Sequence, residues 1–133
     1  MIRARPNRFL RISLIVATLV LLVSGCNYFD RRDKAASRLT GGNPKVGRDK
    51  ILYYGCQSCH NIPGIRGAKG MVGPPLDHIA RRTYIAGELP NTPQNMMYWI
   101  RKPREVEQHT AMPDMNVSEN DSRDIVAYLY TLQ

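Results

Sequence analysis

Four patterns that often decide the class of a protein are missing from this 133-residue sequence. Its long uncharged stretch, Ile12 to Gly25, is shorter than the roughly 20 apolar residues that a membrane-spanning helix requires. No segment alternates polar and apolar residues for long, so a β-sheet protein is not expected. The sequence contains no internal repeat and no nucleic-acid-binding motif. The net charge of +8 therefore does not indicate nucleic acid as a partner.

Cysteine is also scarce, with three in the chain. Two of them occur in Cys56-Gln57-Ser58-Cys59-His60, which has the C-x-x-C-H spacing of a c-type haem attachment site. Two thiols one helical turn apart can each form a thioether with a haem vinyl group, and His60 can then bind the iron as the proximal ligand. The segment therefore predicts one covalently bound haem c.

Three other uses of these cysteines are weaker. A thioredoxin-like redox pair requires a surrounding βαβ pattern, which the sequence lacks. A zinc site needs four ligands, and only His78 or His109 could complete the set, at spacings that fit no usual zinc pattern. A disulfide between Cys56 and Cys59 would close only a very small loop. The haem interpretation is favoured because the surrounding sequence agrees with it independently.

The N-terminal residues have the composition of an export signal. Four arginines and no acidic residue precede the apolar stretch, as in a secretory signal peptide. The stretch ends in Val23-Ser24-Gly25-Cys26, which resembles the lipobox of bacterial lipoproteins, in which the cysteine is acylated and becomes the new N-terminus. The resemblance implies a signal peptide over residues 1–25 and a lipid anchor on Cys26 at a membrane of the periplasm. An ordinary signal peptide with a chance cysteine, or a short uncleaved anchor, is the alternative.

The rest of the chain is expected to form a tether and one small domain. Residues 26–46 are mostly polar, include Gly41, Gly42 and Pro44, and show no apolar periodicity, so we expect a lipid-anchored tether. Residues 47–133 suit one small domain, to which a buried haem would add much apolar contact. Beyond residue 25 the chain carries 15 basic and 11 acidic residues. This modest excess suits docking to a partner or a membrane surface.

Four helical segments are predicted in this domain, and together they indicate an all-α fold. They cover about 47–59, 76–82, 93–102 and 119–132. Thr92 is a suitable N-cap and Pro93 a suitable first residue for the third segment, which ends before Pro103. Ser118 and Asp121 resemble a capping box at the start of the last segment.

The second face of the iron needs a ligand, and methionines are the main candidates. Met112 lies in a loop just before the last helix, where Pro113 stiffens the chain by fixing φ and removing a donor. Met96 and Met97 lie in a predicted helix, where packing in the core is the expected use. We predict Met112 as the sixth ligand, with Met115 as the alternative.

The order of these motifs resembles that of class I cytochrome c over residues 47–132. C-x-x-C-H is followed by Gly-Pro-Pro-Leu at 73–76, a tryptophan helix, Ala-Met-Pro at 111–113 and Ala-Tyr-Leu at 127–129. The most detailed likeness is to the cytochrome c domain fused to subunit II of some haem–copper oxidases, which shares the runs LPNTP at 89–93 and WIRKP at 99–103. This chain shows no membrane-spanning hairpin and no copper-ligand cluster, so we expect a free-standing module.

The resemblance implies further residues of the haem site. The carbonyl of Pro74 would accept a hydrogen bond from the proximal imidazole, and Leu76 would pack on the haem face. Trp99 would donate its indole N–H to a haem propionate, and Arg81 or Arg82 would pair with a propionate. Leu76 and Trp99 also suit ordinary core burial, and the two arginines suit an ordinary exposed surface.

The resemblance also implies an electron-transfer protein and not an enzyme. His60 and Met112 would hold the iron six-coordinate, leave no position for a substrate and raise the reduction potential. We therefore expect a membrane-tethered periplasmic carrier of single electrons in a respiratory chain. Its partners would be redox proteins such as a membrane oxidase or dehydrogenase. The alternatives are a dedicated electron-accepting subunit of such a complex and, less favoured, a haem-based ligand sensor.

Overall fold

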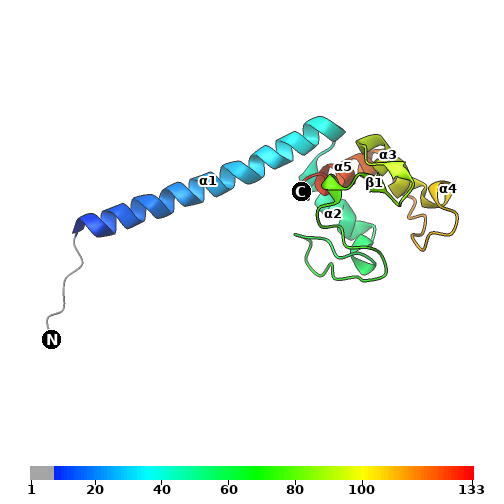
Figure 1. Ribbon diagram of the computed structural model, residues 1–133, viewed down its shortest axis with the longest axis horizontal. Coiled ribbons are helices and arrows are strands. Elements are labelled where there is room, and N and C mark those ends of the chain that lie inside the picture. Colours follow the sequence, from blue (N-terminus) through cyan, green and yellow to red (C-terminus); the bar gives the residue numbers. More distant parts are fainter. Residues whose placement is uncertain (1–7) are drawn as a thin grey trace. The chain divides into compact units, whose positions relative to one another are not determined.

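The structure is a computed structural model that describes residues 8–133, and helices dominate it (Figure 1). The chain divides into one unit that ends at Arg32 and a larger unit that covers Asp33–Gln133. Helix α1 covers Arg8–Thr40, and the division falls within it. Among residues 8–133, no helix has both the length and the apolar character that crossing a membrane requires.

The predicted signal peptide and lipid anchor fall partly outside the described residues. Residues 1–7 of the basic region are not described, and neither is the side chain of Cys26. Signal cleavage and lipidation therefore remain predictions.

The larger unit is built from helices joined by long loops. Helix α5 packs against both α2 and α3, and a small two-stranded antiparallel ribbon lies beside α3. The elements after α1 are α2 (Pro44–Tyr53), η1 (Cys56–Ser58), η2 (Ile79–Arg81), β1 (Tyr84–Ile85), β2 (Leu89–Pro90), α3 (Pro93–Arg101), α4 (Pro103–Val106) and α5 (Glu119–Leu129). The two η elements are single 3₁₀ turns, so the unit is all-α in character, as predicted.

Glycine allows α2 and α5 to cross closely. A Cβ atom on Gly47 would lie 1.9 Å from the carbonyl oxygen of Asp124, which is far inside contact distance. Just before α2, a Cβ atom on Gly42 would lie 2.3 Å from the carbonyl oxygen of Arg123. The backbone N–H of Asn43 donates to Asp124 Oδ1 at 2.7 Å. Residues 42–47 are thus packed directly against the last helix.

These contacts correct the predicted boundary between tether and domain. The predicted tether covers residues 26–46, but residues 33–46 of it belong to the larger compact unit. Ala36, Thr40 and Pro44 are buried, and residues up to Thr40 continue helix α1. The segment packs through small side chains and close backbone contacts, which produce no apolar periodicity in the sequence.

The helix caps agree with the sequence, whereas two helix lengths do not. Thr92 Oγ1 accepts from the Asn95 N–H, and Ser118 Oγ accepts from the Asp121 N–H. The segment predicted over 76–82 contains only the turn η2, because His78 before it has a left-handed φ of 51°. The first segment, predicted to reach about residue 59, ends at Tyr53. The two ribbon strands were not predicted, because two residues each are too few to show a periodic pattern.

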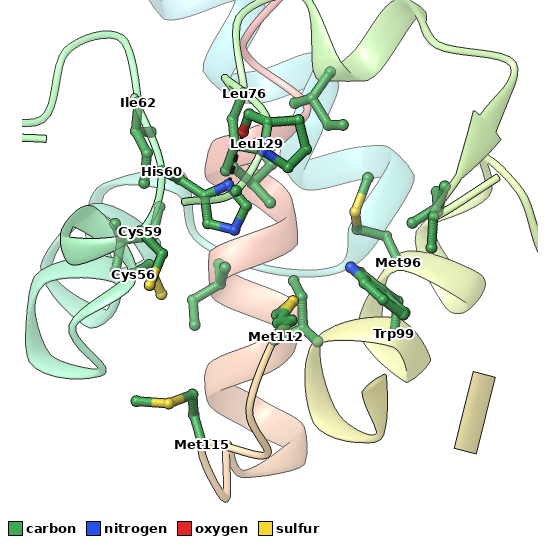
Figure 2. A pocket seen from close by; sticks show the side chains of 18 of the residues that line it. Cys56, Cys59, His60, Ile62, Leu76, Met96, Trp99, Met112, Met115 and Leu129 are labelled. Carbon is green, nitrogen blue, oxygen red and sulfur yellow. Dashed lines mark hydrogen bonds between the residues drawn. The ribbon is translucent and has the colours of Figure 1, made fainter. Parts of the chain in front are cut away.

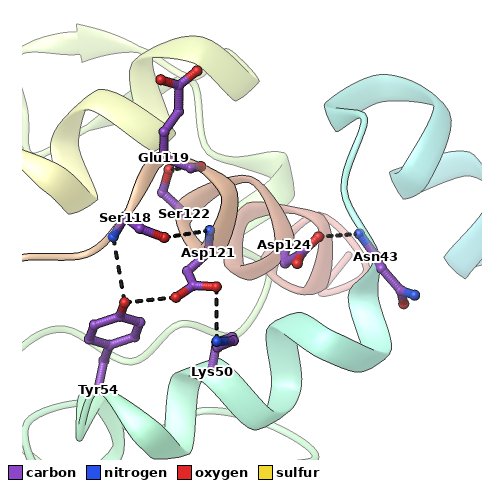
Figure 3. A network of polar contacts seen from close by, with 8 residues as sticks. All are labelled: Asn43, Lys50, Tyr54, Ser118, Glu119, Asp121, Ser122 and Asp124. Atoms are coloured by element: carbon purple, nitrogen blue, oxygen red, sulfur yellow. Dashed lines mark hydrogen bonds and ion pairs between the residues drawn. The ribbon is translucent and has the colours of Figure 1, made fainter.

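A cluster of ionic and phenolic groups joins the start of α5 to α2 (Figure 3). Asp121 pairs with Lys50 Nζ at 3.0 Å and accepts a hydrogen bond from the Tyr54 hydroxyl at 2.8 Å. The hydrogen bonds from Lys50 and Tyr54 lower the pKa of Asp121 below its ordinary value. The carboxylate therefore stabilises the folded state in its charged form.

We predict that Asp121→Asn lowers the free energy of unfolding near neutral pH and changes it little in strong acid. Because the folded-state pKa lies below the unfolded value of about 3.9, the stabilisation is complete above that value. It is lost as the pH falls through the folded-state pKa. Denaturant titration of both proteins across pH measures the difference. Glu88→Gln, at an exposed carboxylate, is the control, and a pH-independent deficit for Asp121→Asn would contradict the prediction.

Candidate cofactor site

A mostly apolar cavity of about 370 Å³ lies beside α5 in the larger unit (Figure 2). Its volume falls within the range of roughly 300–1,000 Å³ that is usual for small-molecule and cofactor sites. The walls come from η1, the loop before η2, the ribbon, α3, the loop before α5 and α5 itself. Prominent apolar lining residues are Ile62, Leu76, Met96, Trp99 and Leu129.

One wall carries the two thiols and the imidazole of the C-x-x-C-H motif. Gly55, with a φ of 74°, ends α2 and turns the chain into η1. The N–H groups of Cys59 and His60 both donate to the carbonyl of Cys56, at 3.3 and 3.0 Å. This single turn brings Cys56, Cys59 and His60 to the same cavity (Figure 2). Burial raises the pKa of the Cys56 thiol.

The orientation of the His60 ring is fixed by the loop that follows. His60 Nδ1 lies 2.7 Å from the carbonyl oxygen of Pro74. Because a carbonyl can only accept, Nδ1 must carry the proton, and Nε2 is left with its lone pair. Figure 2 shows the second ring nitrogen of His60 directed into the cavity. The geometry leaves Nε2 available as a metal ligand.

Glycine is required where the loop passes the imidazole. A Cβ atom on Gly73 would lie 2.3 Å from His60 Cε1 and 2.7 Å from Nδ1. The N–H of Gly73 also donates to the carbonyl of Cys59 at 2.8 Å. A Cβ atom on Gly70 would lie 2.4 Å from the carbonyl carbon of Cys59. The loop is therefore packed against the motif through backbone atoms on both sides of Met71 and Val72.

The loop before α5 supplies both candidate methionines. Met112 and Met115 line the cavity, and Figure 2 shows the Met112 thioether in the space across from His60. The Met112 N–H donates to Thr110 Oγ1 at 3.2 Å, which holds the backbone at that point. Met112 is half-buried, whereas Met115 is 37% exposed. The position of the Met112 thioether across from His60 is the one that its predicted role as a ligand requires.

The remaining residues predicted for the site are divided between the cavity and the surface. Pro74, Leu76, Trp99 and Arg82 line the cavity. Arg82 Nη2 donates to the carbonyl of Pro75 and, at 3.3 Å, to that of Asp77. Arg81 is exposed and is not among the lining residues, so the structure brings only one of the two arginines to the site.

Sequence reasoning missed much of the apolar lining. Ile62, Ile79, Ile85 and Ile125 line the cavity, but their spacing does not distinguish a cofactor contact from core packing. Met96 was expected only in the core, and it is both buried and part of the lining. The spacing His60-Asn61-Ile62, which is part of the family resemblance, is the one signal that could have placed Ile62 in the site.

The chemistry of the cavity fits a covalently held haem. The thiols of Cys56 and Cys59 line the cavity and can form thioethers. His60 Nε2 can bind a metal through its lone pair, and the Met112 sulfur lies across from it. The surrounding wall is apolar, as a buried macrocycle requires. The fold and the site together define a small all-α haem protein.

Comparison with known proteins agrees with this class. The family model described as cytochrome c matches residues 49–133, and the chain belongs to the cytochrome c family. The chain is also similar to cytochrome c oxidase subunit 2 of Alkalihalophilus pseudofirmus, with 34% identity over 88 residues. That match covers 65% of this chain and 25% of the relative, so the chain spans about a quarter of the relative's length. No solved structure matches the chain at a significant level.

The comparisons confirm the resemblance drawn from the sequence, including the likeness to an oxidase subunit II domain. They also confirm the small class I cytochrome c fold. Membership of the family implies a covalently bound haem c and a role in electron transfer that is not itself catalytic.

We predict that Gly73→Ala displaces the His60 ring and lowers the free energy of unfolding of the haem-bound protein by about 1–3 kcal/mol. The new methyl group would occupy the place of the imidazole edge. Denaturant unfolding and the absorbance spectrum report stability and ring placement. Val72→Ala is the control, because Val72 is the adjacent residue and is 72% exposed. Equal free energies of unfolding for the two variants would contradict the prediction, because the loop would then accommodate the new methyl group without destabilising the fold.

Proposed function

We propose that this protein is a membrane-tethered periplasmic cytochrome c that carries single electrons in a respiratory chain. One haem c would be attached through Cys56 and Cys59, and His60 and Met112 would bind its iron. The observation that carries the proposal is the shared apolar cavity, with thiols and imidazole on one wall and the Met112 thioether across from them.

The haem, when bound, supplies an iron that changes its charge by one electron. The chain's own groups would set the conditions for that change. The Pro74 carbonyl accepts a hydrogen bond from His60 Nδ1–H. This contact orients the ring and makes Nε2 a stronger electron-pair donor. The soft sulfur of Met112 favours the reduced metal and so raises the potential. With His60 and Met112 both bound to the iron, no position would be open to a substrate.

The lining of the cavity supports transfer of an electron without chemical change. Ile62, Met96 and Leu129 are buried and keep water from the interior. Few polar groups would then need to reorient when the charge changes, which suits a carrier. Backbone hydrogen bonds hold the segment of His60, and the Met112 N–H donates to Thr110 Oγ1, so both ligands would stay in place in the two redox states.

Met112→Leu tests the ligand set. We predict that the variant loses the sulfur-to-iron charge-transfer band of the oxidised protein, binds carbon monoxide when reduced, and has a lower reduction potential. Absorbance spectra and redox titration measure these changes. Met115→Leu is the matched control and should retain the band. If the band survives in Met112→Leu and disappears in Met115→Leu, Met115 is the ligand.

The location in the periplasm rests on the lipobox-like run at residues 23–26. We predict that the protein incorporates an alkyne-labelled fatty acid in bacterial cells and that Cys26→Ala abolishes the label. Ser24→Ala changes a neighbouring position and keeps the cysteine, so that variant should remain labelled. A label that persists in Cys26→Ala would exclude Cys26 as the anchor.

A dedicated subunit of an oxidase complex is the second candidate function. The observation in its favour is that the relative is named as a subunit of cytochrome c oxidase. A subunit would co-purify from detergent extracts with one complex at a fixed stoichiometry, whereas a mobile carrier would not.

A further inference from the structure

The segment 74–82 carries the carbonyl that orients the proximal imidazole, yet it has little regular structure. Only the turn η2 lies within it, and His78 at the start of that turn has a left-handed backbone. Its shape therefore depends on contacts with other parts of the unit. The N–H of Leu76 donates to Asn61, and the N–H of Ala80 donates to Leu132, but the remaining polar contacts come mostly from side chains.

Asn91 makes the most connections to this segment. Its Nδ2 donates to the carbonyls of Ile79 and Arg82, both at 2.8 Å. Its Oδ1 accepts from the Tyr130 hydroxyl at 3.1 Å, and its backbone N–H donates to Thr83 at 2.9 Å. One amide thus ties both ends of η2 to the end of α5. Burial raises the pKa of Tyr130, so its hydroxyl keeps the proton that it donates.

Arg82 continues the connection toward the imidazole. Asn91 fixes the Arg82 backbone, and the Arg82 guanidinium donates back to the carbonyls of Pro75 and Asp77. Pro75 directly follows Pro74, whose carbonyl accepts from His60. The contacts form one continuous series from α5 through Asn91 and Arg82 to the loop that orients the ring.

We propose that Asn91 is a positioning residue for the hydrogen bond between His60 and Pro74, acting through Arg82. The inference rests on the proposed function, because it takes His60 as the proximal ligand. Without the amide, the segment loses two of its side-chain contacts, and the Pro74 carbonyl moves more freely relative to Nδ1. A weaker hydrogen bond at Nδ1 makes Nε2 a poorer electron-pair donor to the iron. This favours the reduced iron and raises the reduction potential.

The test compares Asn91→Ala with Asn95→Ala in the full, haem-bound protein. Asn95 is the matched control, because its amide donates to the Pro90 carbonyl at 2.9 Å in the same region and not to residues 74–82. Two properties are measured: the exchange rate of the His60 Nδ1 proton by NMR, relative to the Val126 amide in the buried part of α5, and the reduction potential. Asn91→Ala should speed the relative exchange by roughly fivefold or more and raise the potential, and Asn95→Ala should do neither.

A gentler pair keeps the inference testable if Asn91→Ala fails to fold. Tyr130→Phe removes only the hydroxyl that donates a hydrogen bond to Asn91 Oδ1. Its control is Tyr98→Phe, which removes an exposed hydroxyl that donates to Glu105. The first should shift exchange and potential in the same direction as Asn91→Ala, by less. If Asn91→Ala or Tyr130→Phe loses stability while relative exchange and potential match its control, the inference is overturned. Failure of the proposed function itself would appear in the wild type, as a protein without ligated haem.

Discussion

The hydrogen bond between His60 Nδ1 and the Pro74 carbonyl is the contact on which the rest of the site depends. It decides which ring nitrogen carries the proton and therefore which one can bind a metal. The C-x-x-C-H motif only places an imidazole next to two thiols, and it does not orient the ring. Gly73 is part of the same requirement, because the backbone must approach the ring more closely than any side chain would allow. Which ring nitrogen of His60 is available to a metal thus depends on a short loop fourteen residues away in sequence.

The helical frame brings that loop and the motif together. Gly47 lets α2 cross α5 at backbone contact, and η1 follows directly after α2. Helix α5 also lines the cavity and, through Tyr130 and Asn91, holds the segment after Pro74. The same helix therefore contributes to the cavity wall and also holds the segment that follows Pro74. We therefore expect a change at the helix crossing to affect the predicted iron ligands without any direct contact with them.

Local chemistry in the sequence predicted the parts of the site that depend on spacing or on a single residue type. The haem motif and the Thr92 and Ser118 caps belong to this group: the motif side chains line one cavity, and both caps form. The contact between Pro74 and His60 was implied by the family resemblance, and the structure shows that hydrogen bond. Features that depend on tertiary contacts could not be predicted. Ala36 is buried by packing that leaves no periodic pattern, and the two carbonyls that accept from Asn91 become neighbours only in the folded chain.

We propose that Cys56 and Cys59 hold one haem covalently and that His60 would bind its iron. The most direct measurement is mass spectrometry of the peptide that contains residues 56–60, after the matured protein has been extracted with acidified organic solvent. The account predicts that the pigment stays with the peptide, which carries the mass of one haem and has no free thiol. A colourless protein, or a pigment that enters the solvent and leaves two free thiols behind, would contradict it.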